Sequence, residues 1–347
     1  MNRAGADILA DPFAESPAGI ATRRLQLLGA DFRFDSQARP LGELVKAAYG
    51  GLPMQRLHTE PPRIRVKLVL LPGGAPSRRA QPAATSMISG GGYLCAANGA
   101  SSFAIVSPAE RAGLVTLSAA MLRYPYHARY EYLEFAVFTL AARVQRLVPL
   151  HAACIGRSGN GVLLMGPSGS GKSTAALHCL LRGMDFLAED AVFVAPAGLL
   201  ATGVANYLHV CRNSLQWLRR TTVYAQIRSS PLIRRRSGVR KFEVDLRRGP
   251  FNLAATPLQL KAVVLLSARK AERHTLLQPL PPSRIRSALT LNQPYAAGRP
   301  EWDSFVRKVE SLPVFTLYRG GHPNDTVDAI ETLLPTDGRA RAGHGRG

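Results

Sequence analysis

The chain has 347 residues, of which 46% are hydrophobic and 19% charged, a composition typical of a globular protein with a substantial core and not of a disordered chain. No window approaches the roughly 18 uncharged apolar residues of a membrane helix, and the first residues show no signal-peptide stretch, so we expect a soluble, cytoplasmic protein without membrane partners. The net charge of +21 is compatible with nucleic acid, an anionic membrane surface or an acidic partner, and also with composition alone. The four cysteines have no metal-site or disulfide spacing, so we expect them to be reduced.

Residues 1–149 are predicted to form a separate α+β region with a possible role in substrate or partner recognition. We expect a strand near 32–34, a helix at 41–48, an alternating strand at 63–71, a loop at 72–86, an antiparallel meander of 93–97, 103–106 and 114–118, and a helix at 130–148. In the last helix Leu133, Val137, Leu140, Val144 and Leu147 recur at helical spacing. We expect this stripe to pack on the next domain.

Residues 150–335 are predicted to form the domain that carries the chemistry, an α/β domain. Two strands, 151–155 and 161–165, are joined by a Gly/Ser turn. The second strand leads into a glycine-rich loop, and a helix at 173–181 follows and ends at Gly183. The next strand, 186–190, ends in the acids Glu189 and Asp190.

The glycine-rich loop has the complete pattern of a phosphate-binding loop. Its glycines let backbone N–H groups point inward, where they and the following helix N-terminus hold phosphate oxygens. Lys172 would reach the β and γ oxygens, and the Ser173 hydroxyl would bind Mg²⁺. We therefore predict ATP and Mg²⁺ as ligands, bound by Gly166, Pro167, Ser168, Gly169, Ser170, Gly171, Lys172, Ser173 and Thr174.

Phosphoryl transfer also needs a metal and a base that orients the acceptor. We expect Ser173 and Asp190 to hold Mg²⁺ and Glu189 to act as the base, although an acid at a strand end is often only a helix cap or an ion-pair partner. His151 contacts the γ-phosphate or the acceptor, or else is a core histidine. Lys241 either clamps phosphate from a mobile loop or is solvated.

The segment from His151 to Val194 resembles the catalytic core of the HPr kinase/phosphorylase family. A His opens the hairpin, a Gly-x-Ser-Gly-x-Gly-Lys-Ser loop and a short helix follow, and the next strand ends in paired acids. The resemblance implies the P-loop NTPase fold shared with phosphoenolpyruvate carboxykinases, and a kinase acting on a serine hydroxyl of a protein or peptide. The family's first acid is usually an aspartate proposed as the base, and its second assists the metal. The Glu-x-Arg-Gly motif of the bifunctional enzymes has no counterpart in 203–212, so phosphorylase activity and HPr as substrate do not follow.

A dense basic cluster occupies residues 228–248, for which we expect a solvated face or a substrate-docking loop. Few aromatic residues interleave with it, which disfavours stacking on single-stranded nucleic acid. Three functions remain open: a kinase, a nucleotide-dependent switch or ATPase that binds a partner, and a nucleic-acid-directed ATPase. A homo-oligomer is possible. Trp217, Trp302 and His58 are interpreted as packing or surface residues, and the tail 336–347 as disordered.

Overall fold

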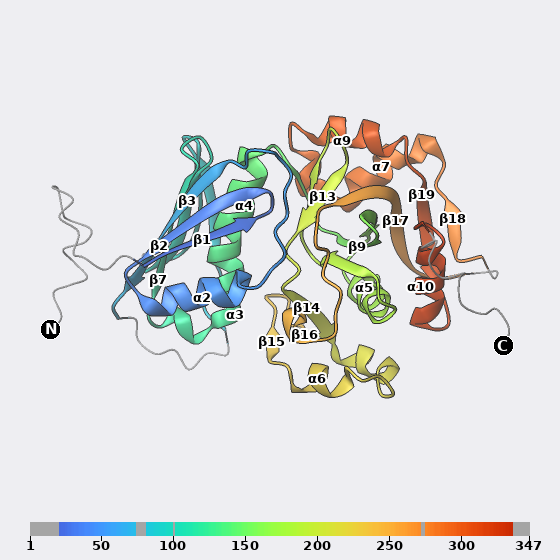
Figure 1. The fold of residues 1–347 in the computed structure, drawn as a ribbon, viewed down its shortest axis with the longest axis horizontal. Helices are drawn as coiled ribbons and strands as arrows, with labels where there is room; N and C mark the ends of the chain where they lie inside the picture. The colour runs from blue at the N-terminus through green and yellow to red at the C-terminus, as the bar shows by residue number, and fades with distance from the viewer. Residues whose placement is uncertain (1–20, 74–80, 100, 272–274, 336–347) are drawn as a thin grey trace, which may run out of the picture. The chain divides into compact units, whose positions relative to one another are not determined.

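The computed structural model describes residues 21–73, 81–99, 101–271 and 275–335 (Figure 1). Contacts divide the chain into unit 1, residues 1–50 and 58–145, and unit 2, residues 51–57 and 146–347. The sequence placed a boundary after residue 149 and did not indicate that 51–57 group with the second unit. Gln55 anchors this segment, since its Nε2 donates to the Ala254 carbonyl at 2.8 Å. Residues 74–80 of the predicted loop and the predicted tail 336–347 lie outside the described residues.

Unit 1 is built on one seven-stranded sheet in the order β1-β2-β3-β7-β6-β5-β4. β2, β3 and β7 are parallel, and the other pairs are antiparallel. The central strands alternate buried and exposed residues because one face is covered, as the sequence of 63–71 predicted. The strands are β1 (Ala21–Leu27), β2 (Ala30–Ser36), β3 (Arg63–Leu71), β4 (Ser86–Gly90), β5 (Tyr93–Asn98), β6 (Ser102–Ser107) and β7 (Ala112–Ser118).

Among the described residues of unit 1, two helices cover the sheet. α2 (Arg39–Tyr49) packs on β1–β3, and α4 (Glu134–Val144) packs on β6 and β7. A short helix, α3 (Pro125–His127), and a π-helical turn at Ala128–Leu133 precede α4. The predicted helix 130–148 therefore ends four residues early. Its apolar stripe packs on its own sheet, where Leu140 lies against Gly113, and the expectation that it serves only to pack on the next domain is wrong.

Unit 2 contains a nine-stranded mixed sheet and a separate three-stranded sheet, which makes the chain a mixed α/β protein with three sheets. β10, β17 and β19 are parallel, so their carboxyl ends meet at one edge. The predicted hairpin is present as β9 and β10. The strands of the large sheet are β8 (Val148–Leu150), β9 (Ala153–Arg157), β10 (Asn160–Met165), β11 (Asp185–Ala188), β12 (Val192–Ala195), β13 (Leu200–Gly203), β17 (Leu258–Lys270), β18 (Leu277–Pro279) and β19 (Val314–Arg319).

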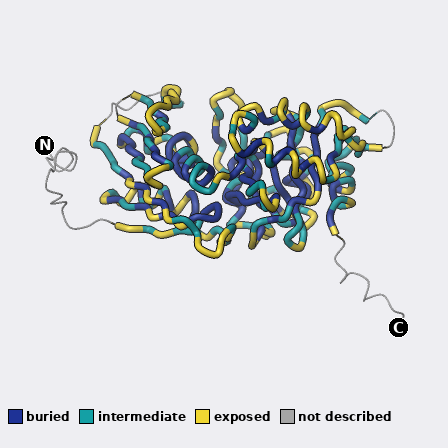
Figure 2. Tube along the Cα trace, turned by 90° about the horizontal axis from the view of Figure 1, so that it is seen from above, coloured by how far each residue is buried: buried dark blue, intermediate teal, exposed yellow. Residues whose placement is uncertain are grey.

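Both faces of this sheet are buried under helices. α5 (Lys172–Leu181) and α10 (Pro323–Glu331) lie side by side on the face that carries Val162 and Leu164. Three helices cover the face that carries Leu163 and Met165: α7 (Pro282–Asn292), α8 (Pro294–Ala297) and α9 (Trp302–Val309). Alternate side chains of β10 thus enter two different cores, which explains its unbroken apolar run. Figure 2 shows buried stretches running through the interior of each unit.

The three-stranded sheet has the order β14-β16-β15 and borders the core that contains α5. It consists of β14 (Tyr207–Cys211), β15 (Leu232–Arg234) and β16 (Arg240–Asp245), with α6 (Tyr224–Ser229) between β14 and β15. The cysteines are free, as expected. Within the described ranges, every helix is too short or too polar to cross a bilayer.

Candidate functional site

The glycine-rich loop of residues 166–174 connects β10 to α5 at the edge where the parallel strands end. Gly166, Gly169 and Gly171 have φ values of +148°, +84° and +102°, a region that side-chain-bearing residues rarely adopt. A Cβ atom on Gly166 would lie 2.8 Å from the Leu266 carbonyl of β17, so the loop also needs glycine to approach the neighbouring strand. With these glycine conformations, the backbone curves around the N-terminus of α5.

Lys172 is the first residue of α5 and is only 6% exposed. Its Nζ donates to the carbonyl oxygens of Gly166, at 2.6 Å, and Pro167, at 3.3 Å, and so lies inside the curve of the loop. Burial lowers the pKa of Lys172, while the charges of Asp190 and Glu189 act in the opposite direction. The backbone carbonyl groups of the loop therefore position the Lys172 amine.

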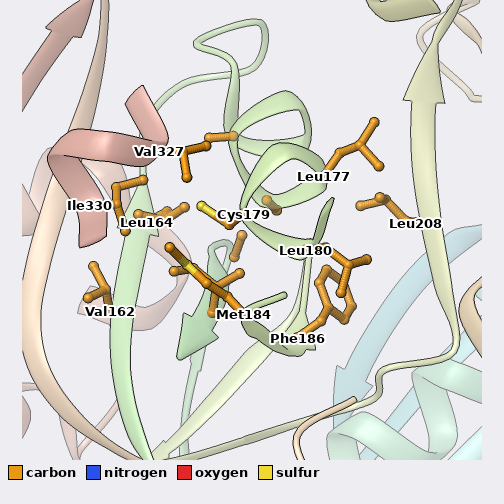
Figure 3. Close-up of a cluster of buried hydrophobic side chains, with 14 of the residues drawn as sticks. Val162, Leu164, Leu177, Cys179, Leu180, Met184, Phe186, Leu208, Val327 and Ile330 are labelled. Atoms are coloured by element: carbon orange, nitrogen blue, oxygen red, sulfur yellow. The ribbon is translucent and has the colours of Figure 1, made fainter. Parts of the chain in front are cut away.

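The core of unit 2 holds α5 in place beneath the loop. In one apolar cluster, Cys179 of α5 points toward Leu164, Leu180 lies beside Phe186, and Leu177 points toward Leu208 of β14 (Figure 3). At the other end Gly183 has a φ of +82°, and Met184 N donates to the Cys179 carbonyl at 3.1 Å, which closes the helix as predicted. The N-terminus of α5 is therefore anchored by packing of the helix along its length.

Glu189 follows β11 directly and lies behind Ser173. The Ser173 hydroxyl donates to Glu189 Oε1, and the backbone N–H of His209 in β14 donates to Glu189 Oε2 at 2.8 Å. The Glu189 side chain is 2% exposed. It is therefore held between the glycine-rich loop and the three-stranded sheet.

Asp190, the next residue, occupies a different environment. Its carboxylate accepts from the Arg235 guanidinium, and it lines a cavity that Glu189 does not reach. Burial alone would raise the pKa of Asp190, but the charge and hydrogen bond of Arg235, with His209 and Lys241, outweigh it and lower the pKa below its ordinary value. The two adjacent acids therefore lie in different environments. The Glu189 carboxylate is buried against Ser173, and Asp190 lines the cavity.

His209 and Glu243 form a buried pair behind the acids. They lie opposite each other in the register of β14 and β16, and His209 Nε2 is 3.3 Å from Glu243 Oε1. Burial would lower the pKa of His209, but the carboxylates of Glu189 and Glu243 raise it to about 9. This pair therefore extends the group of buried charged side chains from Glu189 into the three-stranded sheet.

Lys241 lies on β16 and not in a mobile loop, which corrects the sequence-based expectation. Its Nζ is 3.5 Å from Ser173 Oγ and 3.9 Å from Glu189 Oε1. Arg235 approaches from the turn between β15 and β16, where its Nη2 is 2.9 Å from His209 Nδ1. One β-hairpin therefore brings two cations to the acids.

His151 lies just before β9 and is exposed, so it is not a core histidine. Its Nδ1 is 3.2 Å from the Asp190 carbonyl oxygen, and its side chain lines the same cavity as Asp190. The buried side chain of Gln293 holds the His151 backbone from both sides, accepting from N at 2.8 Å and donating to O at 3.0 Å. Its position beside Asp190 is well defined.

The cavity has a volume of about 440 Å³, within the range of small-molecule sites. Its lining includes the glycine-rich loop, Asp190, Arg235 and Lys241. It also includes the rings of Trp217, Tyr318 and His322, with the Trp217 and His322 ring centroids 4.8 Å apart. Trp217, interpreted from sequence as a packing or surface residue, belongs to this site.

The donor atoms beside the loop fit a hard divalent cation. The Ser173 hydroxyl and the Glu189 carboxylate touch, and Glu189, Asp190 and His209 offer ligand atoms within 4.8 Å of one another. Both ring nitrogens of His209 already face protein partners, Glu243 and Arg235. The remaining donors are oxygens, which suits Mg²⁺.

The structure brings together every sequence-predicted site residue: the loop of 166–174, the two acids, His151 and Lys241. Sequence reasoning missed His209, Glu243 and the individual role of Arg235. A signal was present, because His209 and Glu243 each stand inside an apolar triplet, Leu208-His209-Val210 and Phe242-Glu243-Val244. Ionisable residues in such strands need each other as partners.

Comparison with protein-family models gives no match, and neither does comparison with curated protein sequences. Among solved structures, the HPr(Ser) kinase/phosphatase from Coxiella burnetii is similar over 53% of this chain and 87% of its own, with 16% identity and a TM-score of 0.29. This structural likeness is weak. At this TM-score, a functional conclusion has to be based on the geometry of the site.

Proposed function

We propose that this protein is an ATP- and Mg²⁺-dependent kinase with a P-loop fold related to HPr kinase, which transfers the γ-phosphoryl group to a serine hydroxyl of a protein or peptide. One observation carries the proposal. The carboxylate of Asp190 and the glycine-rich loop border the same cavity, while Glu189 is buried against the Ser173 hydroxyl. A kinase needs this division between an acid that meets the acceptor and an acid that serves the metal.

The glycine-rich loop would hold the phosphates. Its backbone N–H groups and the N-terminus of α5 attract the anionic tail, and the Lys172 ammonium lies among them. Ser173 and Glu189 would hold Mg²⁺, which when bound would supply positive charge to neutralise the phosphate oxygens. Lys241 adds a second cation within reach of Ser173.

Asp190 is the base in this proposal, and Glu189 the metal-side acid, the reverse of the roles that the sequence suggested. The acceptor hydroxyl gives its proton to the Asp190 carboxylate, its oxygen forms a bond to the γ-phosphorus, and the bond to the ADP oxygen breaks. Asp190 suits this role because it lines the cavity, whereas the side chain of Glu189 is 2% exposed. Arg235 orients Asp190, and His151 lies beside it for contact with the acceptor or the γ-phosphate.

The aromatic residues of the cavity lining would receive the nucleoside. Trp217 and Tyr318 offer ring surface, and His322 is fixed because its Nδ1 caps α10 by accepting from Asn324 N at 3.0 Å. Because inorganic tripolyphosphate has no nucleoside to contact these rings, we expect it to bind more weakly than ATP.

The test is calorimetric titration with ATP and Mg²⁺, followed by transfer of labelled γ-phosphate to proteins of a dephosphorylated host lysate. We expect binding and at least one labelled serine. Lys172→Ala should weaken ATP binding by roughly thirtyfold, or about 2 kcal/mol, because a charged hydrogen-bond donor to phosphate is lost. Lys308→Ala, an exposed lysine on α9 far from the loop in sequence, is the control and should bind normally.

Each alternative function has its own result in this assay. ATP binding with transfer only to water would favour the nucleotide-dependent switch. Hydrolysis stimulated by DNA or RNA, without a labelled protein, would favour the nucleic-acid-directed ATPase. Absence of ATP binding by the unmodified protein would end the proposal.

A further inference from the structure

The two edge strands of the unit 1 sheet differ in how they are protected. β1 and β4 stand at the two ends of the strand order, and within the described residues each pairs with one neighbouring strand. Edge strands of natural proteins usually carry charges, proline or a bulge, which discourage pairing with another chain. β1 carries Arg23 and Arg24, whereas β4 has the sequence Ser-Met-Ile-Ser-Gly and a regular register with β5. β4 is therefore the edge that is open to another strand.

The sequence around β4 has no charge. Residues 80–109 form the longest stretch of the chain without Asp, Glu, Lys or Arg, although 19% of all residues are charged and the net charge is +21. This stretch supplies β4, β5 and β6. Two copies of so basic a protein repel each other. An uncharged edge lets them approach without placing like charges opposite one another.

β4 also exposes apolar side chains. All five of its residues are exposed, and Met87 and Ile88 are each 63% exposed. Tyr93, at the start of β5, is 53% exposed and lies on the same face as Ile88, because Ile88 is opposite Cys95 in the register. Neighbouring exposed apolar side chains usually mark an interaction surface.

The turn between β4 and β5 determines which backbone groups point to the open edge. Residues 91 and 92 have φ values of +57° and +83°, typical of a two-residue type I′ turn, so the residues on either side of it form a hydrogen-bonded pair. Hydrogen-bonded and non-hydrogen-bonded pairs alternate along antiparallel strands. Gly90 and Ile88 therefore bond to β5, whereas the backbone N–H and C=O groups of Met87 and Ser89 point away from it.

A second copy of β4 can satisfy these outward groups. When two β4 strands run antiparallel about a twofold axis at Ile88, Met87 of each copy is opposite Ser89 of the other. Each of these pairs exchanges two backbone hydrogen bonds, so all four outward groups of each copy find a partner. Ile88 then lies opposite its own counterpart, at a non-hydrogen-bonded position where side chains approach most closely.

We propose that this protein forms a homodimer in which the β4 strands of two copies pair antiparallel about Ile88, so that the two unit 1 sheets become one continuous sheet. This inference does not depend on the proposed kinase function. The pairing stops at two copies, because the outer edges of the joined sheet are β1 strands with Arg23 and Arg24. An acidic protein, the partner that a charge of +21 would attract, finds no cation on β4.

The test is sedimentation equilibrium of the full-length protein from roughly 1 to 100 µM, with hydrogen exchange of residues 86–90. We expect a species of twice the chain mass of 37.4 kDa, and exchange of this segment that slows as the dimer forms. Ile88→Lys brings two ammonium groups together at the axis and should raise the dimer Kd at least roughly 100-fold. Ser89→Pro removes an outward N–H that β5 does not use and should raise it at least roughly tenfold.

The matched control is Leu291→Lys, which also replaces an exposed apolar side chain by lysine, on α7. It should leave Kd unchanged, whereas a rise equal to that of Ile88→Lys would show an effect of net charge only and overturn the proposal. A monomer over the whole concentration range would also overturn it, as would association beyond two copies or a dimer that Ile88→Lys and Ser89→Pro leave intact. Circular dichroism checks the fold of each variant. If Ile88→Lys does not fold, Ser89→Pro and the hydrogen exchange of the unmodified protein decide the question.

Discussion

Each unit buries a cluster of charged side chains, and the two clusters differ in how they are built. In unit 1, His127 Nδ1 pairs with Glu131 Oε1 at 2.9 Å and Arg129 Nε with Glu134 Oε1 at 3.1 Å. All four residues come from one continuous helical segment, and none of them lines the cavity of unit 2. We refer to them as the helical cluster.

The cluster of unit 2 is assembled from separate elements. Glu189 and Asp190 follow β11, His209 belongs to β14, and Arg235 and Lys241 come from the β15–β16 hairpin. These groups meet at the glycine-rich loop, and three of them line the cavity. We refer to them as the site cluster.

The difference shows that buried charge alone is a poor sign of function. Both clusters contain acids paired with cations, as any buried charge requires. Only the site cluster combines long-range assembly with a cavity and a glycine-rich loop, and that combination favours chemistry over structural support. Substitutions in each cluster should therefore have opposite consequences for activity and stability.

The largest expected effect is that of Asp190→Asn. Loss of the proposed base should lower kcat for transfer by roughly 10²–10⁴-fold, the usual range for general-base catalysis, while ATP binds no more weakly than before. Rapid-quench measurement of transfer, with calorimetry for ATP, checks this. Asp245→Asn makes the same chemical change on β16, away from the cavity, and should leave kcat unchanged. Retained transfer by Asp190→Asn would remove Asp190 from the role of base.

Glu189→Gln should have the next largest effect, on the metal requirement. Because Glu189 touches Ser173, we expect the Mg²⁺ concentration for half-maximal transfer to rise roughly 10- to 100-fold. A titration of transfer rate against Mg²⁺ at saturating ATP measures it. An unchanged Mg²⁺ requirement with a lost rate would restore the roles suggested by the sequence, with Glu189 as base and Asp190 at the metal.

Glu134→Gln in the helical cluster should have the smallest effect on transfer. It removes the charge that faces Arg129, so the free energy of unfolding should fall by about 1–3 kcal/mol. Transfer by the folded protein should not change. Urea unfolding followed by circular dichroism, with the transfer assay below the transition, tests both statements. A folded variant without activity would show that the comparison between the two clusters is mistaken.

Much of the local structure followed from sequence because its causes are local. Strand 63–71 alternates along the chain, and the glycine-rich loop depends on glycines within a few residues of one another. The end of α5 at Gly183 and the strand before Glu189 were predicted for the same reason. The length of the helix ending at Val144 and the packing of its stripe were not, because both depend on the sheet that it covers.

The sequence by itself determined the phosphate-binding pattern, the two acids one helix later and the concentration of arginine, since each is a property of neighbouring residues. Only the tertiary structure decided which acid lies against Ser173 and which lines the cavity, because both acids follow the end of β11, where no strand alternation fixes the side to which a side chain points. Packing of the three-stranded sheet beside α5 likewise decided that Arg235 and Lys241 turn inward while Arg234, Arg236 and Arg240 are exposed. Residues this far apart in the chain become partners through the packing of the strands that carry them, and no local pattern contains that information.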